Sequence, residues 1–311
     1  MPQWREIAAG LRFPEGPIAL PDGSVLLVEI ARGTLTRVYP DGTLEVVATP
    51  GGGPNGAALG PDGKCYLCNN GGMRWRERHG QLHPGLQPEE YTGGRIERVD
   101  LATGAVDILY TGTADVALRG PNDLVFDAYG GFWFTDNGKT RRREQDRTGV
   151  FYATADGSVL KEVIFPLLTP NGIGLSPDGT RLYVAESLTA RLWAFDITAP
   201  GELCREPWPN GGTLIAGLPG YQLFDSLAVD SAGNICVATL MHGGITRPGG
   251  ITVISPDGTQ VAFIPLPDVY VTNLCFGGPD LRTAYITLSS TGRLVAMAWP
   301  RPGLALHYLN R

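Results

Sequence analysis

The sequence lacks several features that mark common functional classes. No apolar run approaches the roughly 20 residues that a membrane helix needs, and residues 1–6 lack the charged-then-apolar pattern of a secretory signal. We therefore expect a cytoplasmic protein with no membrane partner. Lys and Arg number 25 against 31 Asp and Glu, a net charge of −6, and the longest basic cluster is residues 141–143. This balance argues against a nucleic-acid-binding surface, so no nucleic-acid partner is expected.

Motifs of covalent and redox catalysis are also scarce. The chain contains no Gly-x-Ser-x-Gly elbow, and Ser187 and Ser226, which lie beside acidic residues, have no histidine at a suggestive spacing. A serine hydrolase is therefore disfavoured. The five cysteines are odd in number, and Cys65 and Cys68 fall within one expected strand. Residues three apart in a strand face opposite sides of the sheet, which argues against a shared metal or redox role.

Glycine and proline are abundant, at 43 and 25 residues, and they punctuate a repeat. Six times a polar residue opens a short apolar run, and a turn, often Pro-Asp-Gly, leads into a second β-rich run. Proline presets φ and glycine accepts a positive φ, so this tripeptide predicts a tight turn between two strands. The opening residues are Glu15, Asn55, Asn122, Asn171, Asp225 and Asn273. Their spacings of 40, 67, 49, 54 and 48 residues are typical of β-propeller blades with insertions.

Further β-rich runs complete four strands in each repeat. Second strands are expected at 24–30, 64–68, 131–135, 180–185, 234–239 and 283–288, and third strands at 33–39, 94–100, 149–154, 190–196, 250–255 and 292–299. We predict an all-β fold, a six-bladed β-propeller of four-stranded antiparallel blades around a central metal-binding channel. Residues 1–311 are expected to form a single domain, with strand 4–8 or strand 304–309 closing the last blade.

The six opening residues predict a polar ring at one end of the channel, because the first strand of every blade lines it. Two carboxylates and four carboxamides form an all-oxygen donor set, which hard cations such as Ca²⁺ prefer. One such residue is equally explained by an Asx turn, whereas six matched positions favour a divalent cation. A cation with open coordination positions supports hydrolysis. Asp225 is the best-placed general base and Asp123 the reserve, although a metal-bound carboxylate is a weak base.

Loop residues are the candidates for substrate contact. The longest insertion, at about residues 71–92, separates the second and third strands of blade two and is expected to act as a lid. Within it, Trp75 could stack on a substrate ring and Arg74 could hold a carboxylate or hydroxyls. The alternative is a surface loop whose Trp75 packs on the blade. His242 follows the second strand of blade five and could reach the channel rim.

Other candidates lie on or beside the ring itself. Asn137 follows the second strand of blade three and returns to the ring end of the channel, and its neighbours Asp136 and Lys139 share that placement. Turn chemistry explains this Asp-Asn-Gly segment equally well. The ring residues Asn55 and Asn273, together with Asp123, complete the expected substrate contacts.

Five segments carry a resemblance to a known family. They are Phe13-Pro-Glu-Gly-Pro, Gly120-Pro-Asn-Asp-Leu, Thr169-Pro-Asn-Gly-Ile, Phe224-Asp-Ser-Leu-Ala-Val-Asp and Cys68-Asn-Asn-Gly-Gly. With them the chain resembles the gluconolactonase, regucalcin (senescence marker protein) and luciferin-regenerating enzyme family of six-bladed propeller lactonases, from about residue 10 to about residue 300. The resemblance implies one divalent cation held by Glu15, Asn171 and Asp225. It also implies Asn122 as fourth ligand or substrate contact, and Asp225 as the base.

The implied activity is the opening of a sugar lactone in carbohydrate metabolism. Ca²⁺ is the first expectation for the cation, with Zn²⁺, Mn²⁺, Mg²⁺ or Fe²⁺ as substitutes. An arginine that contacts sugar hydroxyls in some members is matched here by Gly120, with Arg119 one place earlier, so sugar specificity does not carry over. Two alternatives stay open: a phosphoesterase resembling diisopropyl fluorophosphatase, and a propeller that is a binding platform and not an enzyme. The sequence leaves monomer and dimer equally open.

Overall fold

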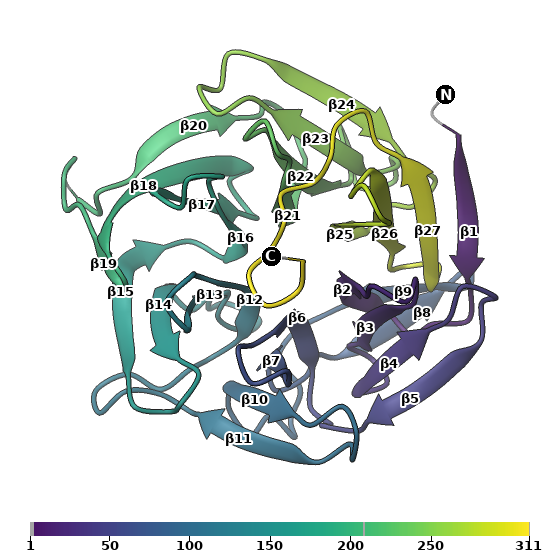
Figure 1. Cartoon of the computed structure of the whole chain (residues 1–311), viewed down its shortest axis with the longest axis horizontal. Coiled ribbons are helices and arrows are strands. Elements are labelled where there is room, and N and C mark those ends of the chain that lie inside the picture. Colours follow the sequence, from purple (N-terminus) through teal and green to yellow (C-terminus); the bar gives the residue numbers. More distant parts are fainter. Residues whose placement is uncertain (1–2, 208, 311) are drawn as a thin grey trace.

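The turn-flanked apolar runs of the sequence form the strands of six antiparallel sheets around a central channel (Figure 1). The computed structural model describes residues 3–207 and 209–310, so residues 1, 2, 208 and 311 lie outside the description. The innermost strands are β2 (Pro14–Ala19), β6 (Pro54–Leu59), β12 (Pro121–Phe126), β16 (Pro170–Leu175), β21 (Leu223–Val229) and β25 (Val271–Gly277). The predicted six-bladed β-propeller is confirmed.

Each blade continues outward through three more strands. The second strands are β3 (Val25–Glu29), β7 (Cys65–Asn69), β13 (Gly131–Asp136), β17 (Arg181–Glu186), β22 (Ile235–Leu240) and β26 (Thr283–Leu288). The third strands are β4 (Thr34–Val38), β10 (Arg95–Val99), β14 (Thr148–Thr154), β18 (Arg191–Ala199), β23 (Gly250–Ile254) and β27 (Arg293–Ala298). The outer strands are β5 (Leu44–Ala48), β11 (Val106–Tyr110), β15 (Leu160–Leu167), β20 (Thr213–Gly217), β24 (Val261–Pro265) and β1 (Trp4–Ala8). The short β19 (Glu202–Leu203) also pairs with β18.

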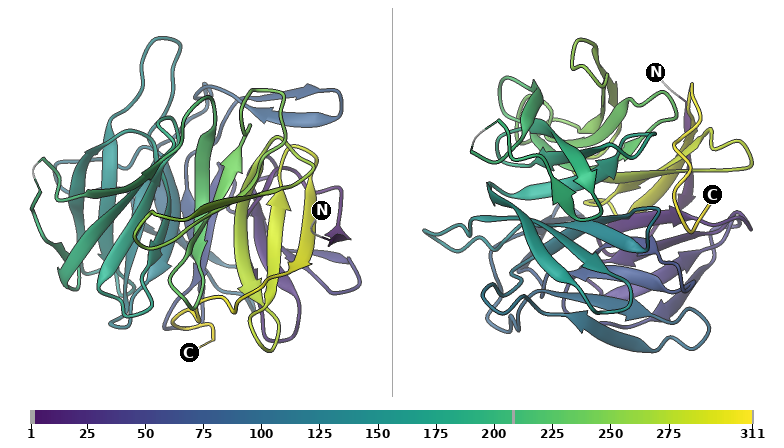
Figure 2. Two further views of the ribbon diagram at one scale, coloured as in Figure 1. Left: turned by 90° about the horizontal axis from the view of Figure 1, so that it is seen from above. Right: turned by 60° about the vertical axis from the view of Figure 1, so that its left-hand side comes forward.

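The N-terminal strand closes the ring. Strand β1 pairs antiparallel with β27, with Trp4 opposite Met297, so the last blade combines the two ends of the chain. The C-terminal segment, the alternative candidate for closure, instead runs across one end of the channel (Figures 1 and 2). No helix long and apolar enough to cross a membrane occurs in residues 3–207 or 209–310.

The hydrophobic core consists of six clusters, one between each pair of neighbouring blades. Side chains on the two faces of a blade therefore belong to different clusters. Cys65 packs with Leu26 between blades 1 and 2, whereas Cys68 packs with Phe132 between blades 2 and 3. The two cysteines face opposite sides of β7, as their spacing predicts, and all five cysteines are free thiols.

Candidate metal and catalytic centre

Every innermost strand carries a register irregularity at or beside its ring residue. In blade 1 it lies between Glu15 and Ile18, and the other five blades have an equivalent. Such a β-bulge bends the strand and re-aims its side chains. The residue after the ring position is glycine in blades 1, 2 and 4. A Cβ at Gly16 or Gly172 would lie 2.5 or 2.6 Å from backbone atoms of the next innermost strand, so only glycine lets these strands meet at the axis.

In blade 3 the residue after the ring position is Asp123, so the channel holds three buried or partly buried carboxylates. Burial raises the pKa of Glu15 to about 8, and the negative charge of Asp123 adds to this shift. Burial also raises the pKa of Asp123 to about 7. The pKa of Asp225 lies well above its ordinary value because of burial and the charge of Glu15, with a hydrogen bond from Asn171 offsetting part of the shift. Among the described residues, none of the three forms an ion pair with Lys or Arg.

The ring asparagines differ in how their amides are engaged. Asn273 donates from Nδ2 to Glu15 Oε2 at 2.7 Å, and its Oδ1 accepts the Leu274 amide at 2.7 Å. Asn171 donates from Nδ2 to Ser187 Oγ at 3.1 Å. Asn122 Oδ1 is buried without a hydrogen-bond partner in the described structure. An unpaired buried acceptor costs roughly 1–3 kcal/mol, so Asn122 Oδ1 is suited to a ligand that accepts its lone pair.

These groups suit a divalent cation. In residues 3–207 and 209–310 no three His, Cys, Asp or Glu side chains gather closely enough to hold a metal by themselves, so a metal site here would need amide oxygens as well. Glu15 and Asp225 offer carboxyl oxygens that pair with no described Lys or Arg, and Asn122 offers a buried oxygen that no donor in the described structure satisfies. Asn171 completes an oxygen set that suits Ca²⁺. Asn273 has both ends of its amide engaged and orients Glu15.

Buried acidic residues at the ends of second strands hold the segments that lead into the ring. Each carboxylate accepts a backbone N–H from the third residue before a ring residue. The pairs, each at 2.7 Å, are Glu29 with the Arg12 amide, Asp136 with the Arg119 amide, and Glu186 with the Leu168 amide. Asp136, considered above as a substrate contact, also accepts the amides of Gly120 and Gly138. The sequence signal for this role is an acid as the last residue of the second strand, preceded by apolar residues.

The insertion of blade 2 forms a hairpin, β8 (Trp75–Arg78) and β9 (Gln81–Pro84), which lies over the ring end of blades 1 and 6 (Figure 2). Trp75 packs against Phe13, with ring centroids 4.9 Å apart, and the Leu82 amide donates to Ser290 O at 2.9 Å. Arg74 pairs with the exposed Glu89 at 2.7 Å. In this arrangement Trp75 packs on the blade, and neither Trp75 nor Arg74 makes a described contact with a ring residue.

The remaining candidate residues lie in different parts of the propeller. Asn137 donates from Nδ2 to Pro170 O at 3.3 Å, next to the ring residue Asn171. Asn55 is buried in the ring. His242 packs on Phe263 of the outer strand β24, with centroids 3.8 Å apart. Lys139 is also buried.

Lys139 anchors the base of the insertion. Its Nζ donates to Asn70 Oδ1 at 3.2 Å and to Gly72 O at 2.7 Å. Both acceptors lie where the chain leaves β7 and enters the insertion. The ammonium group therefore ties blade 3 to the root of the hairpin.

Sequence reasoning missed Tyr270, the residue directly before β25. Its ring lies 5.8 Å from the ring of Phe13 and 5.6 Å from that of His83 in the hairpin. Burial raises the pKa of Tyr270 to about 12, and nearby acidic groups that include Asp225 add to the shift. Tyr270 therefore belongs to the ring end of the channel. The sequence offers one weak signal that Tyr270 belongs to the site, because Tyr270 lies three residues before the ring residue Asn273.

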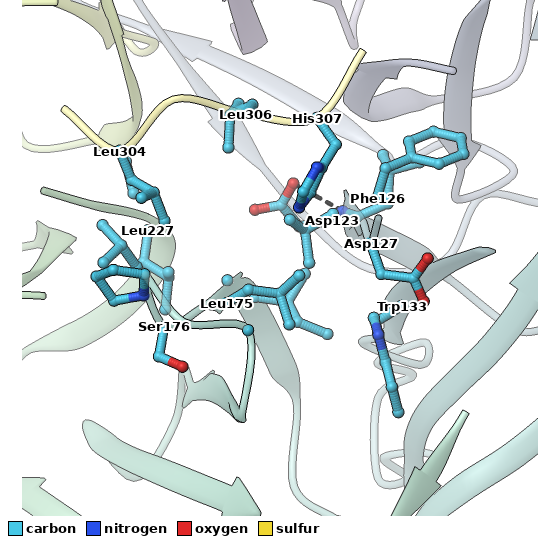
Figure 3. A pocket seen from close by; sticks show the side chains of 18 of the residues that line it. Asp123, Phe126, Asp127, Trp133, Leu175, Ser176, Leu227, Leu304, Leu306 and His307 are labelled. Carbon is cyan, nitrogen blue, oxygen red and sulfur yellow. Dashed lines mark hydrogen bonds between the residues drawn. The ribbon is translucent and has the colours of Figure 1, made fainter. Parts of the chain in front are cut away.

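The opposite end of the channel is covered by the C-terminal segment (Figure 2). A cavity of about 410 Å³ lies there, lined by Phe126, Leu175 and Leu227 and bounded by residues 304–307. Figure 3 shows Asp123 reaching this cavity from the channel side while Leu304 and Leu306 approach from the C-terminal segment. Because this end is covered, a substrate is expected to approach the ring from the hairpin end.

Residues 13–290 match the model of the SMP-30/Gluconolactonase/LRE-like region. A gluconolactonase of Zymomonas mobilis is 28% identical over 91% of this chain and 78% of its own length. Lactonase drp35 of Staphylococcus saprophyticus is 29% identical over 85% of this chain and 73% of its own.

Solved structures agree on the fold. A gluconolactonase from Xanthomonas campestris superposes with a TM-score of 0.73 at 23% identity, covering 96% of this chain and 90% of that one. Regucalcin from Agrobacterium tumefaciens, a calcium-binding protein, superposes with a TM-score of 0.73 at 18% identity, covering 97% and 95%. At these identities the likeness confirms the propeller architecture.

Proposed function

Since this chain belongs to the SMP-30/gluconolactonase/LRE-like family, we propose that it hydrolyses a lactone to the hydroxy acid with the aid of a divalent cation. A sugar lactone such as δ-gluconolactone is the first candidate substrate, and Ca²⁺ is the first candidate ion. The named gluconolactonase and lactonase relatives support the reaction class. The observation that carries the metal is Asn122 Oδ1, which is buried without a partner in the described structure, in the same ring as carboxylates that pair with no described Lys or Arg.

The roles of the residues follow from their positions. Glu15, Asn122, Asn171 and Asp225 would hold the cation, and Asn273 would keep Glu15 in orientation through its 2.7 Å hydrogen bond. A divalent cation supplies Lewis acidity to such a centre and lowers the pKa of coordinated water. Asn122 and Asn171 are also placed to hold substrate oxygens, which is a form of electrostatic preorganisation.

We assign the proton transfers to Asp225. Unlike Glu15 and Asp123, Asp225 is a partly exposed residue, and its raised pKa makes its carboxylate a better proton acceptor. In the reaction the water oxygen bonds to the carbonyl carbon and gives a proton to Asp225. The ring C–O bond then breaks, and the leaving alkoxide takes up that proton, so the product is the hydroxy acid.

Metal depletion and replacement test this proposal. Proton release from δ-gluconolactone would be followed in weak buffer, with spontaneous hydrolysis subtracted, for protein treated with EDTA and then resupplied with Ca²⁺, Zn²⁺, Mn²⁺, Mg²⁺ or Fe²⁺. We expect activity to disappear on depletion and to return with one of these ions. Activity that remains after complete removal of metal would contradict the proposed requirement for a divalent cation.

Two comparison measurements keep the alternatives distinct. Hydrolysis of a fluorophosphate but of no lactone, by the metal-loaded protein, would favour a phosphoesterase. A protein that binds no ion and hydrolyses neither substrate would favour a binding platform.

A further inference from the structure

Tyr270 forms part of an aromatic wall at the ring end, and its position is fixed by the surrounding chain. Its amide donates to Asp268 Oδ1 at 2.8 Å, and its carbonyl accepts the Ser289 amide at 2.9 Å. One neighbour of its ring is Phe13, two residues before Glu15, and the other is His83 of the hairpin. A side chain held in this way keeps its ring oriented before any ligand arrives.

The outer part of the Tyr270 side chain is available for contact with a ligand. The residue is partly exposed, and in the described part of the chain its hydroxyl has no hydrogen-bond partner. Beyond it lies the loop between β22 and β23, where the Met241 amide donates to Val269 O and the Gly243 amide to Tyr221 O. Tyr221 is 52% exposed and Ile245 of the same loop 67%. The rim beyond Tyr270 therefore presents aromatic and aliphatic surface.

Several polar side chains at this end are engaged by the protein itself, whereas Asn70 Nδ2, Asn122 Oδ1 and Gln222 Oε1 are buried without a partner in the described structure. Lys139 donates to Asn70 and Gly72, Asn137 to Pro170, and Asp136 accepts three backbone amides. The ring faces of Phe13 and Tyr270 offer no hydrogen-bond partner to hydroxyls on the substrate face that lies against them. A flat, apolar ring face matches what the wall offers, because aromatic side chains contribute by stacking and burial.

We propose that Tyr270 is a specificity-determining residue whose ring stacks on one face of the bound lactone, with substituents directed toward Tyr221. The substrate class that this wall selects is six-membered lactones with an apolar ring face, including benzo-fused lactones, in addition to sugar lactones. This inference rests on the proposed lactonase function.

The test compares variants on three lactones. Values of kcat and KM would be measured on δ-gluconolactone, δ-valerolactone and 3,4-dihydrocoumarin for wild type, Tyr270→Phe, Tyr270→Leu and Tyr270→Ala. Dihydrocoumarin has a phenol leaving group and is intrinsically more reactive, so the readout is how each variant changes the ratio between substrates. Tyr129→Ala, a 78% exposed tyrosine in the turn between β12 and β13, is the matched control.

We expect Tyr270→Ala and Tyr270→Leu to lower kcat/KM for dihydrocoumarin by about fivefold to tenfold through KM, which is the size of an aromatic stacking contribution. The loss for δ-valerolactone should be smaller, and Tyr270→Phe and Tyr129→Ala should resemble wild type. Equal losses on all three lactones, or none, in folded variants would overturn the inference. A loss in Tyr270→Phe equal to that in Tyr270→Ala would also overturn it, because the hydroxyl and not the ring would then be responsible.

Failure of the lactonase proposal is recognised separately, as a wild type that hydrolyses none of the lactones with any ion. In that case, the affinity for 3-(2-hydroxyphenyl)propanoate, measured by calorimetry, still tests whether the aromatic wall binds a flat ring. Weaker binding by Tyr270→Ala than by wild type would support it. Equal binding, or no binding by either protein, would refute it.

Discussion

Asp225 combines partial exposure with a place among other carboxylates, and this combination suits it to proton transfer. Replacing it by Asn removes the base and one anionic ligand while preserving shape. We predict that Asp225→Asn lowers kcat on δ-gluconolactone at saturating Ca²⁺ by at least about 10²-fold, the lower end of what a general base contributes. Calorimetric titration of Ca²⁺ would separate the two roles, because loss of a ligand weakens binding and loss of a base does not.

The matched control is Asp257→Asn, a carboxylate in the exposed turn between β23 and β24 that accepts the Thr259 amide at 3.1 Å. Its kcat should equal that of wild type. An Asp225→Asn variant with unchanged kcat would remove Asp225 from the mechanism.

Asp136 illustrates a residue that acts through the backbone. Its carboxylate accepts the amides of Arg119, Gly120 and Gly138, and the ring residue Asn122 lies two positions after Gly120. We predict that Asp136→Ala lowers the free energy of unfolding by about 2–4 kcal/mol, because amides are left unpaired. Urea denaturation would measure this, and Asp136→Asn, which keeps an acceptor, should lose less.

Asp115→Ala, at an exposed loop position, is the reference for an ordinary surface carboxylate and should change stability by less than about 0.5 kcal/mol. If Asp136→Ala resembled it, the network would contribute nothing to stability.

At the scale of elements, the sequence predicted strands and turns well because each depends on local chemistry. Pro-Asp-Gly and the apolar runs around it specify a hairpin wherever they occur, so second strands such as β26 match their predicted range. The bulges could not be predicted, since they depend on the fit of six strands at the axis. They explain why Asp123, adjacent to Asn122, reaches the channel as well. Tyr270 was missed because its neighbours Phe13 and His83 are brought to it only by the closed ring.

The hairpin β8–β9 stands outside the blades, and its ends are close together. The Arg74 amide donates to Leu86 O at 3.0 Å, so a two-glycine link can replace residues 75–84. We predict that this variant folds as a propeller and binds Ca²⁺ as wild type does, because the ring residues all lie in the blades. Its KM for dihydrocoumarin should rise severalfold, since Tyr270 loses the support of His83. Circular dichroism, calorimetry and steady-state kinetics would check the three parts.

An unchanged KM for this variant would show that the hairpin plays no part in substrate binding. A replacement of residues 113–116 by two glycines, in the exposed loop after β11, is the control for shortening a loop and should leave KM unaltered.

Lys139 connects the base of the same insertion to blade 3, and it makes stability depend on pH. Burial lowers its pKa to about 8 from an ordinary 10.5, with the charges of Asp136 and Asp146 opposing the shift. Between these values the unfolded chain binds more protons than the folded one, so the free energy of unfolding rises with pH. Below pH 8 the amine is charged in both states and the cost of burying it is fully present.

We predict that wild type gains about 3 kcal/mol of stability relative to Lys139→Met between pH 7.5 and 10.5. Urea denaturation of both proteins at several pH values would measure the difference, and titrating groups that do not interact with Lys139 cancel between them. A difference that stays constant with pH would show that the amine titrates normally.

For the whole molecule, closure of the ring determines whether the site exists, because Glu15 comes from the first blade and Asn273 from the last. The cluster between blades 6 and 1 contains Ala8 and Leu11 from the N-terminal segment packed with Leu294. Strand β1 also supplies Trp4, which packs on the neighbouring cluster and lies 5.9 Å from the guanidinium of Arg293. Loss of this strand exposes the edge of β27 and opens two interfaces.

We predict that deleting residues 1–9 lowers the melting temperature by more than about 10 °C, since burial of several apolar side chains and a row of strand hydrogen bonds is lost together. Ca²⁺ should raise the melting temperature of wild type more than that of the deletion variant, because binding stabilises only chains in which Glu15 and Asn273 meet. Differential scanning calorimetry with and without Ca²⁺ would measure both effects.

Trp4→Ala tests one side chain alone and should cost about 2–3 kcal/mol, less than a fully buried tryptophan, because Trp4 is partly exposed. If the deletion variant melted like wild type and kept its full response to Ca²⁺, β1 would not be the closure of the ring, and the channel would have to be held by the blade interfaces alone.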